Sequence, residues 1–446
     1  MLLSQVMFHL KHRLSIINKM LSMKNLFTLI LIATVLFSCQ KQLSPEQSSQ
    51  LWKAYKEHNY FRLDKLVSAL DSGVSTPEVL LFKAKLGYVF NKPEASNHAI
   101  NQLLEKYPRE FNDTLVSDFY LMRSVNFTRL ENYKQALVDG NAFIDKHSKL
   151  YDSTFIAETK DDNLVREALT DVPKMEVIPS DVQIPIHRDM AGLINLPVVL
   201  RNDSVDFVFD SGANMSVIVT SVAEKYGFKP LGKKIYVLAI TGKRMEAQLA
   251  LVNLKMGSIE IKNSPFIVFP DSLLSFANGA YNIKGIIGFP IMNALKQFTV
   301  KDDQFLIIPK TPAQTTSRNF ALDQSTPVIM VTYQNDTLPF HFDTGANSSL
   351  LYSTFFNKYK DFVLQNCKKQ KDQVGGAGGT TDVEAYILGK ASFEAGGVKT
   401  DLDSLRILTK SLMSNQDNLY GNFGQDFMKK YKVMTVNFEG MNIRFE

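Results

Sequence analysis

A six-residue motif occurs twice in this chain, at residues 209–214 and 342–347, as Phe-Asp-Ser/Thr-Gly-Ala-Asn. The same offset of 133 residues extends the match without gaps over the 25 positions of residues 202–226, and eleven of these are identical in residues 335–359. A single Asp-Ser/Thr-Gly triplet arises by chance on the order of 0.2 times in a chain of this length. The repeat is therefore the informative feature, because any fold of this chain must accommodate two related segments that each carry one carboxylate.

Each copy places its carboxylate at the end of an apolar segment that is typical of a strand. Residues 196–209 predict a hairpin with its turn at Asn202 and Asp203, and the second strand ends directly before Asp210. The second copy repeats this pattern before Asp343. The glycine two residues after each acid permits a tight loop, so we expect each acid at a loop tip.

A second element recurs downstream of each motif. Residues 285–292 and 421–428 each contain two glycines three residues apart. The later glycines, Gly288 and Gly424, follow the motif glycines by 76 and 79 residues. Each half of this region therefore contains the same two elements in the same order.

Residues 184–446 resemble the aspartic peptidases of the pepsin and retropepsin kind, because each half pairs an Asp-Ser/Thr-Gly loop with a downstream glycine element. The resemblance implies an all-β, bilobal peptidase domain in which Asp210 and Asp343 are the catalytic pair, with no cofactor and no metal. By the same resemblance, the supporting loop residues are Ser211, Gly212, Thr344 and Gly345, and the ψ-element glycines are Gly288 and Gly424.

Two facing acids suit peptide hydrolysis, since like charges about 3 Å apart cannot both ionise and the pair holds one shared proton. The ionised acid can act as general base and the protonated one can polarise the scissile carbonyl. Pepsin-type enzymes usually have a hydroxyl where this chain has Ala213 and Ala346. Loss of that donor disfavours the anion, so we expect activity nearer neutral pH than in pepsin. Asn422 stands where the family normally has an apolar residue.

Glycine-containing turns at corresponding places in the two halves are candidates for the flaps that cover the cleft in this family. In the first half the candidate is Gly242, within residues 239–243. In the second half the candidates are Gly376 and Gly378, within the glycine run 375–379, for which a plain flexible loop is the alternative interpretation.

Residues 44–170 predict an all-α domain of helical hairpins. Proline at the first helical position marks three helix starts, at Pro45, Pro77 and Pro93. The segment that begins at Asn132 resembles the second helix of a tetratricopeptide repeat, and a similar segment begins at Asn59. An unrelated helical bundle is the alternative. We found no catalytic constellation here and expect a protein partner for this domain.

The N-terminus resembles the export signal of bacterial lipoproteins. Lys24 precedes an apolar run, residues 26–37, which is too short to span a bilayer. Cys39 then closes a segment that resembles a lipobox, so we expect it to be lipidated; an ordinary cleaved signal or a buried helix is the alternative. Met20 or Met23 is a more usual start than Met1, which would make residues 1–22 a misassigned extension.

The charge balance and the number and spacing of histidines and cysteines argue against a nucleic-acid-binding or metal-binding protein. Four basic residues and no acidic ones precede Cys39, so the mature chain carries 46 basic against 45 acidic residues. This balance provides no basic patch for nucleic acid. The histidines lack metal-ligand spacing, and two cysteines cannot build a zinc site. His341, two residues before Asp343, is interpreted as a structural hydrogen-bonding residue.

The sequence therefore predicts an aspartic endopeptidase, active as a monomer on a peptide or protein substrate and anchored by lipid in the bacterial outer membrane, facing the periplasm. The alternative is a catalytically silent lipoprotein that binds peptides through its helices and cleft. The expected boundaries are a signal peptide at 1–38, a tether at 39–43, the helical domain at 44–170, a linker at 171–183, lobe 1 at 184–309, an inter-lobe linker at 310–326 and lobe 2 at 327–446.

Overall fold

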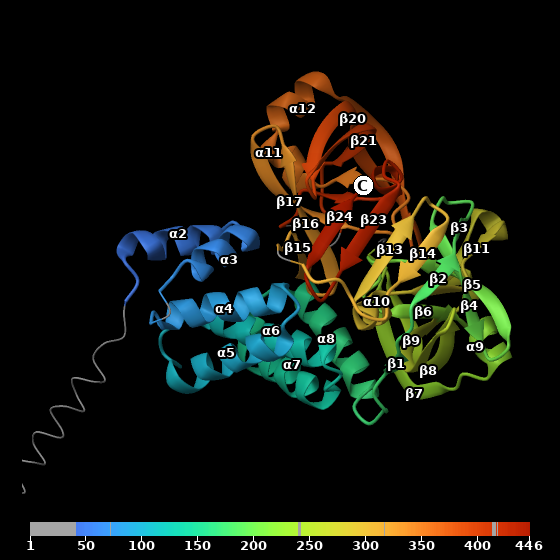
Figure 1. Ribbon diagram of the computed structural model, residues 1–446, viewed down its shortest axis with the longest axis horizontal. Coiled ribbons are helices and arrows are strands. Elements are labelled where there is room, and N and C mark those ends of the chain that lie inside the picture. The colour runs from blue at the N-terminus through green and yellow to red at the C-terminus, as the bar shows by residue number, and fades with distance from the viewer. Residues whose placement is uncertain (1–41, 72, 240–241, 316, 413–415, 417) are drawn as a thin grey trace, which may run out of the picture.

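The computed structural model describes residues 42–446, apart from residues 72, 240–241, 316, 413–415 and 417. Seven α-helices follow one another in its first part, and Figure 1 shows them stacked along one side of the β-rich remainder. They are α2 (Pro45–Lys56), α3 (Tyr60–Ser68), α4 (Pro77–Val89), α5 (Pro93–Lys106), α6 (Asp113–Arg129), α7 (Tyr133–His147) and α8 (Ser153–Ala168).

The predicted helix starts are confirmed. Ser44 caps α2 in a capping box with Gln47, and Thr76 caps α4. Consecutive helices pack as pairs, α4 on α5 and α6 on α7. Close approach within the first pair needs Gly87, since a Cβ there would lie 2.9 Å from the backbone nitrogen of Ser96. The helical class is thereby established, while the tetratricopeptide resemblance stays a prediction.

Lobe 1 is built on a nine-stranded sheet. Its path runs β1-β9-β6-β12-β5-β4-β8-β7, with β3 paired to β4. Strand β12 lies parallel to β5 and antiparallel to β6, which places the second glycine element beside the end of the motif strand. The strands are β1 (Glu176–Ile178), β3 (His187–Arg188), β4 (Ile194–Leu200), β5 (Asp203–Phe209), β6 (Ser216–Val219), β7 (Pro230–Leu238), β8 (Arg244–Met256), β9 (Ile259–Phe269) and β12 (Gly285–Ile287).

Lobe 2 repeats this topology in an eight-stranded sheet ordered β15-β16-β17-β22-β18-β21-β20-β19. Strand β22 lies parallel to β17 and antiparallel to β18, as β12 does to β5 and β6. The strands are β15 (Phe320–Asp323), β16 (Thr326–Tyr333), β17 (Asp336–Phe342), β18 (Leu350–Leu351), β19 (Lys368–Gly376), β20 (Gly379–Ala395), β21 (Val398–Leu408) and β22 (Gly421–Phe423).

A third, five-stranded sheet joins the lobes in the order β2-β14-β13-β23-β24. In Figure 1 it lies between the green lobe 1 and the orange-red lobe 2. Its strands are β2 (Val182–Pro185), β13 (Gln297–Lys301), β14 (Phe305–Ile308), β23 (Val433–Asn437) and β24 (Asn442–Phe445). Short elements complete the lobes: α9 (Thr220–Tyr226), β10 (Ser275–Phe276), β11 (Tyr281–Asn282), α10 (Phe289–Leu295), α11 (Ser353–Lys358), α12 (Lys360–Asn366) and α13 (Gln425–Met428).

Identical residues of the sequence repeat make equivalent contacts in the two lobes. Tyr226 donates its hydroxyl to Asp203 at 3.1 Å, and Tyr359 donates to Asp336 at 2.6 Å. Each pair ties the short helix that follows the motif to the start of the motif strand. The internal duplication read from the sequence is therefore a structural duplication.

Three details differ from expectation. The turn of the first hairpin lies at Arg201 and Asn202, because Leu200 already pairs with Asp203. Within residues 171–183, expected as a linker, β1 pairs with β9 and β2 begins. Within residues 310–326, β15 pairs with β16. Prolines flank these short strands without excluding them, since an edge position tolerates a missing donor.

The helices pack against both lobes. Helix α8 packs on β7 of lobe 1, and α4 packs on β15 of lobe 2. Asn91 donates its side-chain amide to Asn293 at 2.7 Å, and Arg318 pairs with Asp64 at 3.0 Å. Across the described residues, we find no helix with the length and hydropathy that a bilayer crossing requires.

Candidate active site

The two motif loops begin in the same way. Strand β5 ends at Phe209 and β17 at Phe342, so each aspartate is the first residue beyond its strand. The backbone N–H of Asp210 donates to the carbonyl of Ile287 at 3.0 Å, and that of Asp343 donates to Phe423 at 3.0 Å. The neighbouring strand, β12 in lobe 1 and β22 in lobe 2, therefore fixes each motif loop at the point where the loop leaves the sheet.

Hydroxyls then lock the two loops to each other across the lobes. Thr344 Oγ1 accepts from the N–H of Ser211 at 2.8 Å and donates to the carbonyl of Phe209 at 2.7 Å. Reciprocally, Ser211 Oγ accepts from the N–H of Thr344 at 3.0 Å and donates to Phe342 at 3.1 Å. Ser211 and Thr344 are buried, so these bonds compete little with water. We call these two residues the cross-lobe hydroxyl pair.

The motif glycines bring the carboxyls face to face. Gly212 and Gly345 each donate an N–H at 2.8 Å to the aspartate of their own loop. A Cβ on Gly212 would lie 2.6 Å from the Asp343 carboxyl carbon, and one on Gly345 would lie 2.2 Å from that of Asp210. Only glycine permits this approach, so the structure brings together the acids that the sequence singled out.

Burial raises the pKa of both acids, and repulsion by Asp343 adds to the shift of Asp210. The pKa of Asp210 is raised well above its ordinary value, chiefly by burial and then by the neighbouring Asp343. Burial likewise raises the pKa of Asp343, against the opposing effect of hydrogen bonds from Gly345 and its neighbours. The pair therefore retains a proton to higher pH than two isolated carboxyls would.

The ψ glycines support the motif loops from below. Gly288 donates its N–H to Ser216 Oγ at 3.0 Å, and Gly424 donates to Ser349 Oγ at 3.1 Å. Ser216 and Ser349 are identical positions of the sequence repeat, and both are buried. A Cβ on either ψ glycine would lie 2.7 Å from backbone atoms of its motif loop, so both positions require glycine.

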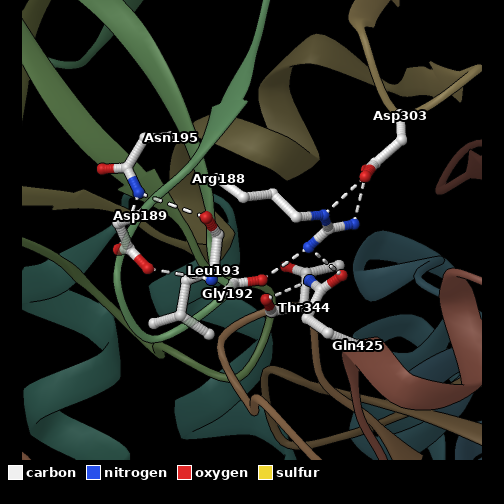
Figure 2. A network of polar contacts seen from close by, with 8 residues as sticks. All are labelled: Arg188, Asp189, Gly192, Leu193, Asn195, Asp303, Thr344 and Gln425. Carbon is white, nitrogen blue, oxygen red and sulfur yellow. Dashed lines mark hydrogen bonds and ion pairs between the residues drawn. The ribbon is translucent and has the colours of Figure 1, made fainter.

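A polar network supports the lobe 2 loop alone, and sequence reasoning missed it. Gln425 is fully buried and donates to the carbonyl of Thr344 at 2.6 Å. Its Oε1 accepts at 2.9 Å from Arg188, a lobe 1 residue that also forms a two-pronged ion pair with Asp303. Figure 2 shows the Arg188 guanidinium between Asp303 and Gln425. The one available signal was that Gln425 occupies the position of Phe289 in the first copy.

The flap candidates lie at hairpin turns, and the two hairpins touch. Gly242 has φ +76° in the turn between β7 and β8, where it donates to the carbonyl of Ala239 at 2.8 Å. Gly376 pairs with Gly379 at the end of β19 and β20, which places Gly378 in the turn with φ +87°. A Cβ on Gly378 would lie 2.8 Å from the Cβ of Ala239, so the lobe 2 tip contacts the lobe 1 hairpin.

Two expectations from the sequence remain: that the chain has no metal site, and that Cys39 is lipidated. In the described part of the chain, no group of three or more His, Cys, Asp or Glu side chains could hold a metal ion. Cys39 lies outside the described residues.

Known proteins resemble parts of this chain. A family model described as "Aspartyl protease" matches residues 196–291, a span that contains the first motif and Gly288. A retropepsin-like aspartic protease from Rickettsia conorii is among the solved structures that match, at 19% identity over 31% of this chain and 96% of that one, with a TM-score of 0.21. Comparison with curated proteins found no match. The family match supports an aspartic peptidase domain that includes residues 196–291.

Proposed function

We propose that this protein is an aspartic endopeptidase in which Asp210 and Asp343 are the catalytic pair. The observation that carries the proposal is that two buried carboxyls from duplicated loops face each other, each against the glycine of the opposite loop. The cross-lobe hydroxyl pair supports it further, since it holds both loops before a substrate arrives. Such preorganisation is what transition-state stabilisation requires.

The mechanism follows from one shared proton. The ionised carboxylate removes a proton from a water molecule between the two acids, and that water attacks the scissile carbonyl carbon. The protonated carboxyl donates a hydrogen bond to the carbonyl oxygen as it gains charge. The carbon–nitrogen bond then breaks, the amine nitrogen takes up a proton from the pair, and the products are a carboxylic acid and an amine.

Both acids belong to one chain, so we propose that the monomer is active. A peptide would lie extended between the lobes beneath the β7–β8 and β19–β20 hairpins, with its backbone hydrogen-bonded to them. The raised pKa of Asp210 supports activity extending toward neutral pH, because the proton that the mechanism needs is held longer as pH rises.

The location proposed for this enzyme is the periplasmic face of the bacterial outer membrane, with Cys39 as the lipidated residue and the helices available to a protein partner. These proposals rest on the sequence of residues 24–42 and on the helical pattern. Metabolic labelling with a clickable fatty acid tests the anchor, and label should appear in wild type and be absent from Cys39→Ser.

Cleavage of a mixed peptide library tests the enzymatic function. We expect wild type to produce fragments between pH 3 and 8, and Asp210→Asn and Asp343→Asn each to lose at least about a thousandfold in kcat/KM. Asp206→Asn is the matched control, because it removes an exposed carboxylate from β5, the strand that ends directly before Asp210. It should cleave like wild type.

Two results would refute the peptidase function. One is identical fragments from wild type and both Asn variants, which would point to a contaminating enzyme. The other is a folded wild type that binds library peptides and cleaves none across this range. That outcome would favour the alternative of a silent peptide-binding protein.

A further inference from the structure

The residue pairs beneath the two carboxyls differ in polarity. In lobe 1, Ile286 on β12 pairs with Val208 on β5. In lobe 2, the equivalent neighbours are Asn422 on β22 and His341 on β17. Val208 and His341 each lie two residues before the motif aspartate and so share its face of the strand. An apolar pair thus underlies one acid and a polar pair underlies the other.

Asn422 reaches the acid of its own lobe. Its Nδ2 lies 3.5 Å from Asp343 Oδ2, while Asp343 Oδ1 accepts from Gly345. The Asn422 side chain belongs to a residue only 8% exposed, so water competes little for this amide. Ala346 provides no hydroxyl for the same oxygen, and Ile286 in lobe 1 has no polar atom to offer. The side-chain donor is therefore supplied to one carboxyl only.

We propose that Asn422 is a positioning residue that breaks the symmetry of the pair, so that Asp343 is the ionised acid and Asp210 carries the shared proton. The inference rests on the proposed function and assigns the two roles within it: Asp343 accepts the proton from water, and Asp210 donates to the substrate carbonyl. The physical reason is that a donor directed at a carboxylate oxygen stabilises the anion.

The surroundings of the pair agree with this assignment. Asp210 accepts two backbone N–H groups, from Gly212 and Ala213, yet burial and the neighbouring Asp343 raise its pKa well above the ordinary value. Two further titratable groups, His341 and Tyr352, face Asp343 from its own lobe. Burial lowers the pKa of His341 to about 3 and raises that of Tyr352, so both are neutral at the working pH. Of these described titratable neighbours, Asp210 is the one that competes with Asp343 for charge.

His341 explains how the amide is oriented. Among the described residues, Asn422 Oδ1 and His341 Nε2 are both buried without a hydrogen-bond partner, and their strands place them side by side. Tyr352 lies 3.3 Å from His341 Nδ1, and when its hydroxyl donates there, the imidazole keeps its hydrogen on Nε2. An N–H at His341 Nε2 favours the amide orientation in which Asn422 Oδ1 faces His341. In that orientation Asn422 Nδ2 faces Asp343.

Carboxyl titration by NMR tests the assignment without requiring turnover. Protein labelled with 13C at the aspartate carboxyl is titrated, and the signals lost in Asp210→Asn and Asp343→Asn identify the pair. We expect the lower midpoint to belong to Asp343. Asn422→Leu keeps the shape of the side chain and removes the donor, so that midpoint should rise by about one pH unit.

Two lobe 1 variants complete the experiment. Ile286→Leu changes shape without adding a donor and should move neither midpoint. Ile286→Asn offers Asp210 the donor that lobe 2 already has, and should bring the two midpoints closer. In the active enzyme, the acidic limb of kcat/KM against pH should rise in Asn422→Leu by the same amount as the NMR midpoint.

The proposal is overturned if the lower midpoint belongs to Asp210, or if it stays within about 0.2 units of wild type in folded Asn422→Leu. Should Asn422→Leu fail to fold, Ile286→Asn decides, since unchanged midpoints there would also overturn it. A wild type without peptidase activity would instead refute the proposed function, and the titration would still report which acid is ionised.

Discussion

The two lobes are alike where they face each other and different where they face their own interiors. Across the lobe boundary, both contribute an aspartate, a hydroxyl and a glycine in equivalent contacts. Behind the loops, lobe 1 has the apolar residues Ile286 and Phe289, whereas lobe 2 has the polar residues Asn422 and Gln425. A residue at the contact between the two loops must fit its own counterpart there, but a residue behind a loop need not. The contacts between the two loops are therefore symmetric, whereas the residues behind the two loops differ.

Removing the cross-lobe hydroxyls should have the largest effect on stability. Thr344→Val leaves the N–H of Ser211 and the carbonyl of Phe209 buried without partners, which we expect to cost about 2 to 4 kcal/mol. Ser211→Ala should cost a similar amount, and the double variant less than the sum. Denaturant unfolding followed by circular dichroism measures the losses.

Trp52, the single tryptophan of the chain, lies in α2 and provides an internal control for these variants. Its fluorescence reports the helical region, whose transition should move less than that of the sheets. If one of the two single variants, Thr344→Val or Ser211→Ala, loses less than about 1 kcal/mol of unfolding free energy and the other loses much more, the two halves of the cross-lobe hydroxyl pair are not equivalent.

Asp210→Asn should stabilise the protein increasingly as pH rises. The pKa of Asp210 is raised in the folded protein, whereas the unfolded chain releases this proton near pH 4. Above that pH the folded state binds more protons than the unfolded state, so the stability of wild type falls as pH rises toward the folded pKa. Asparagine does not titrate, so we expect the substitution to stabilise the protein more at pH 7 than at pH 4.

Thermal unfolding at several pH values measures this gain. Asp343→Asn sharpens the comparison between lobes. It should gain less, because it also removes the anion that Asn422 supports. Equal gains from both substitutions would contradict the asymmetry.

The smallest effect is expected where the helices hold the lobe 1 hairpin. Arg244, directly beyond the hairpin turn, forms a two-pronged ion pair with Asp161 of α8 and stacks on Tyr236. The Arg244 side chain is half exposed to solvent, so Asp161→Asn should cost under about 1 kcal/mol. Hydrogen exchange should increase at the β7–β8 hairpin and stay unchanged at β19–β20. Lys255→Met, which breaks another exposed pair in lobe 1, should alter neither hairpin.

The sequence was sufficient for features that depend on local pattern. The motif loops, both ψ glycines and the helix starts at Ser44 and Thr76 follow from short-range chemistry and from an internal repeat that can be aligned. The interaction of Arg188 with Gln425 could not be predicted, because it joins residues 237 positions apart that share no period. The strands within the expected linkers could not be predicted either, because β1 and β2 are stabilised by partner strands that are distant in the sequence, and β15 by its pairing with β16.

The five-stranded sheet between the lobes has a consequence for folding. Strand β13 pairs with β23 at Gln297 and Asn437, so this sheet closes a loop of about 140 residues. Contacts of such sequence separation pay a large loop-closure entropy and slow folding. Because β23 and β24 follow the strands of the lobe 2 sheet in the chain, a growing polypeptide cannot complete the five-stranded sheet until lobe 2 has been made. The five-stranded sheet can therefore join the two lobes only after both motif aspartates have been made.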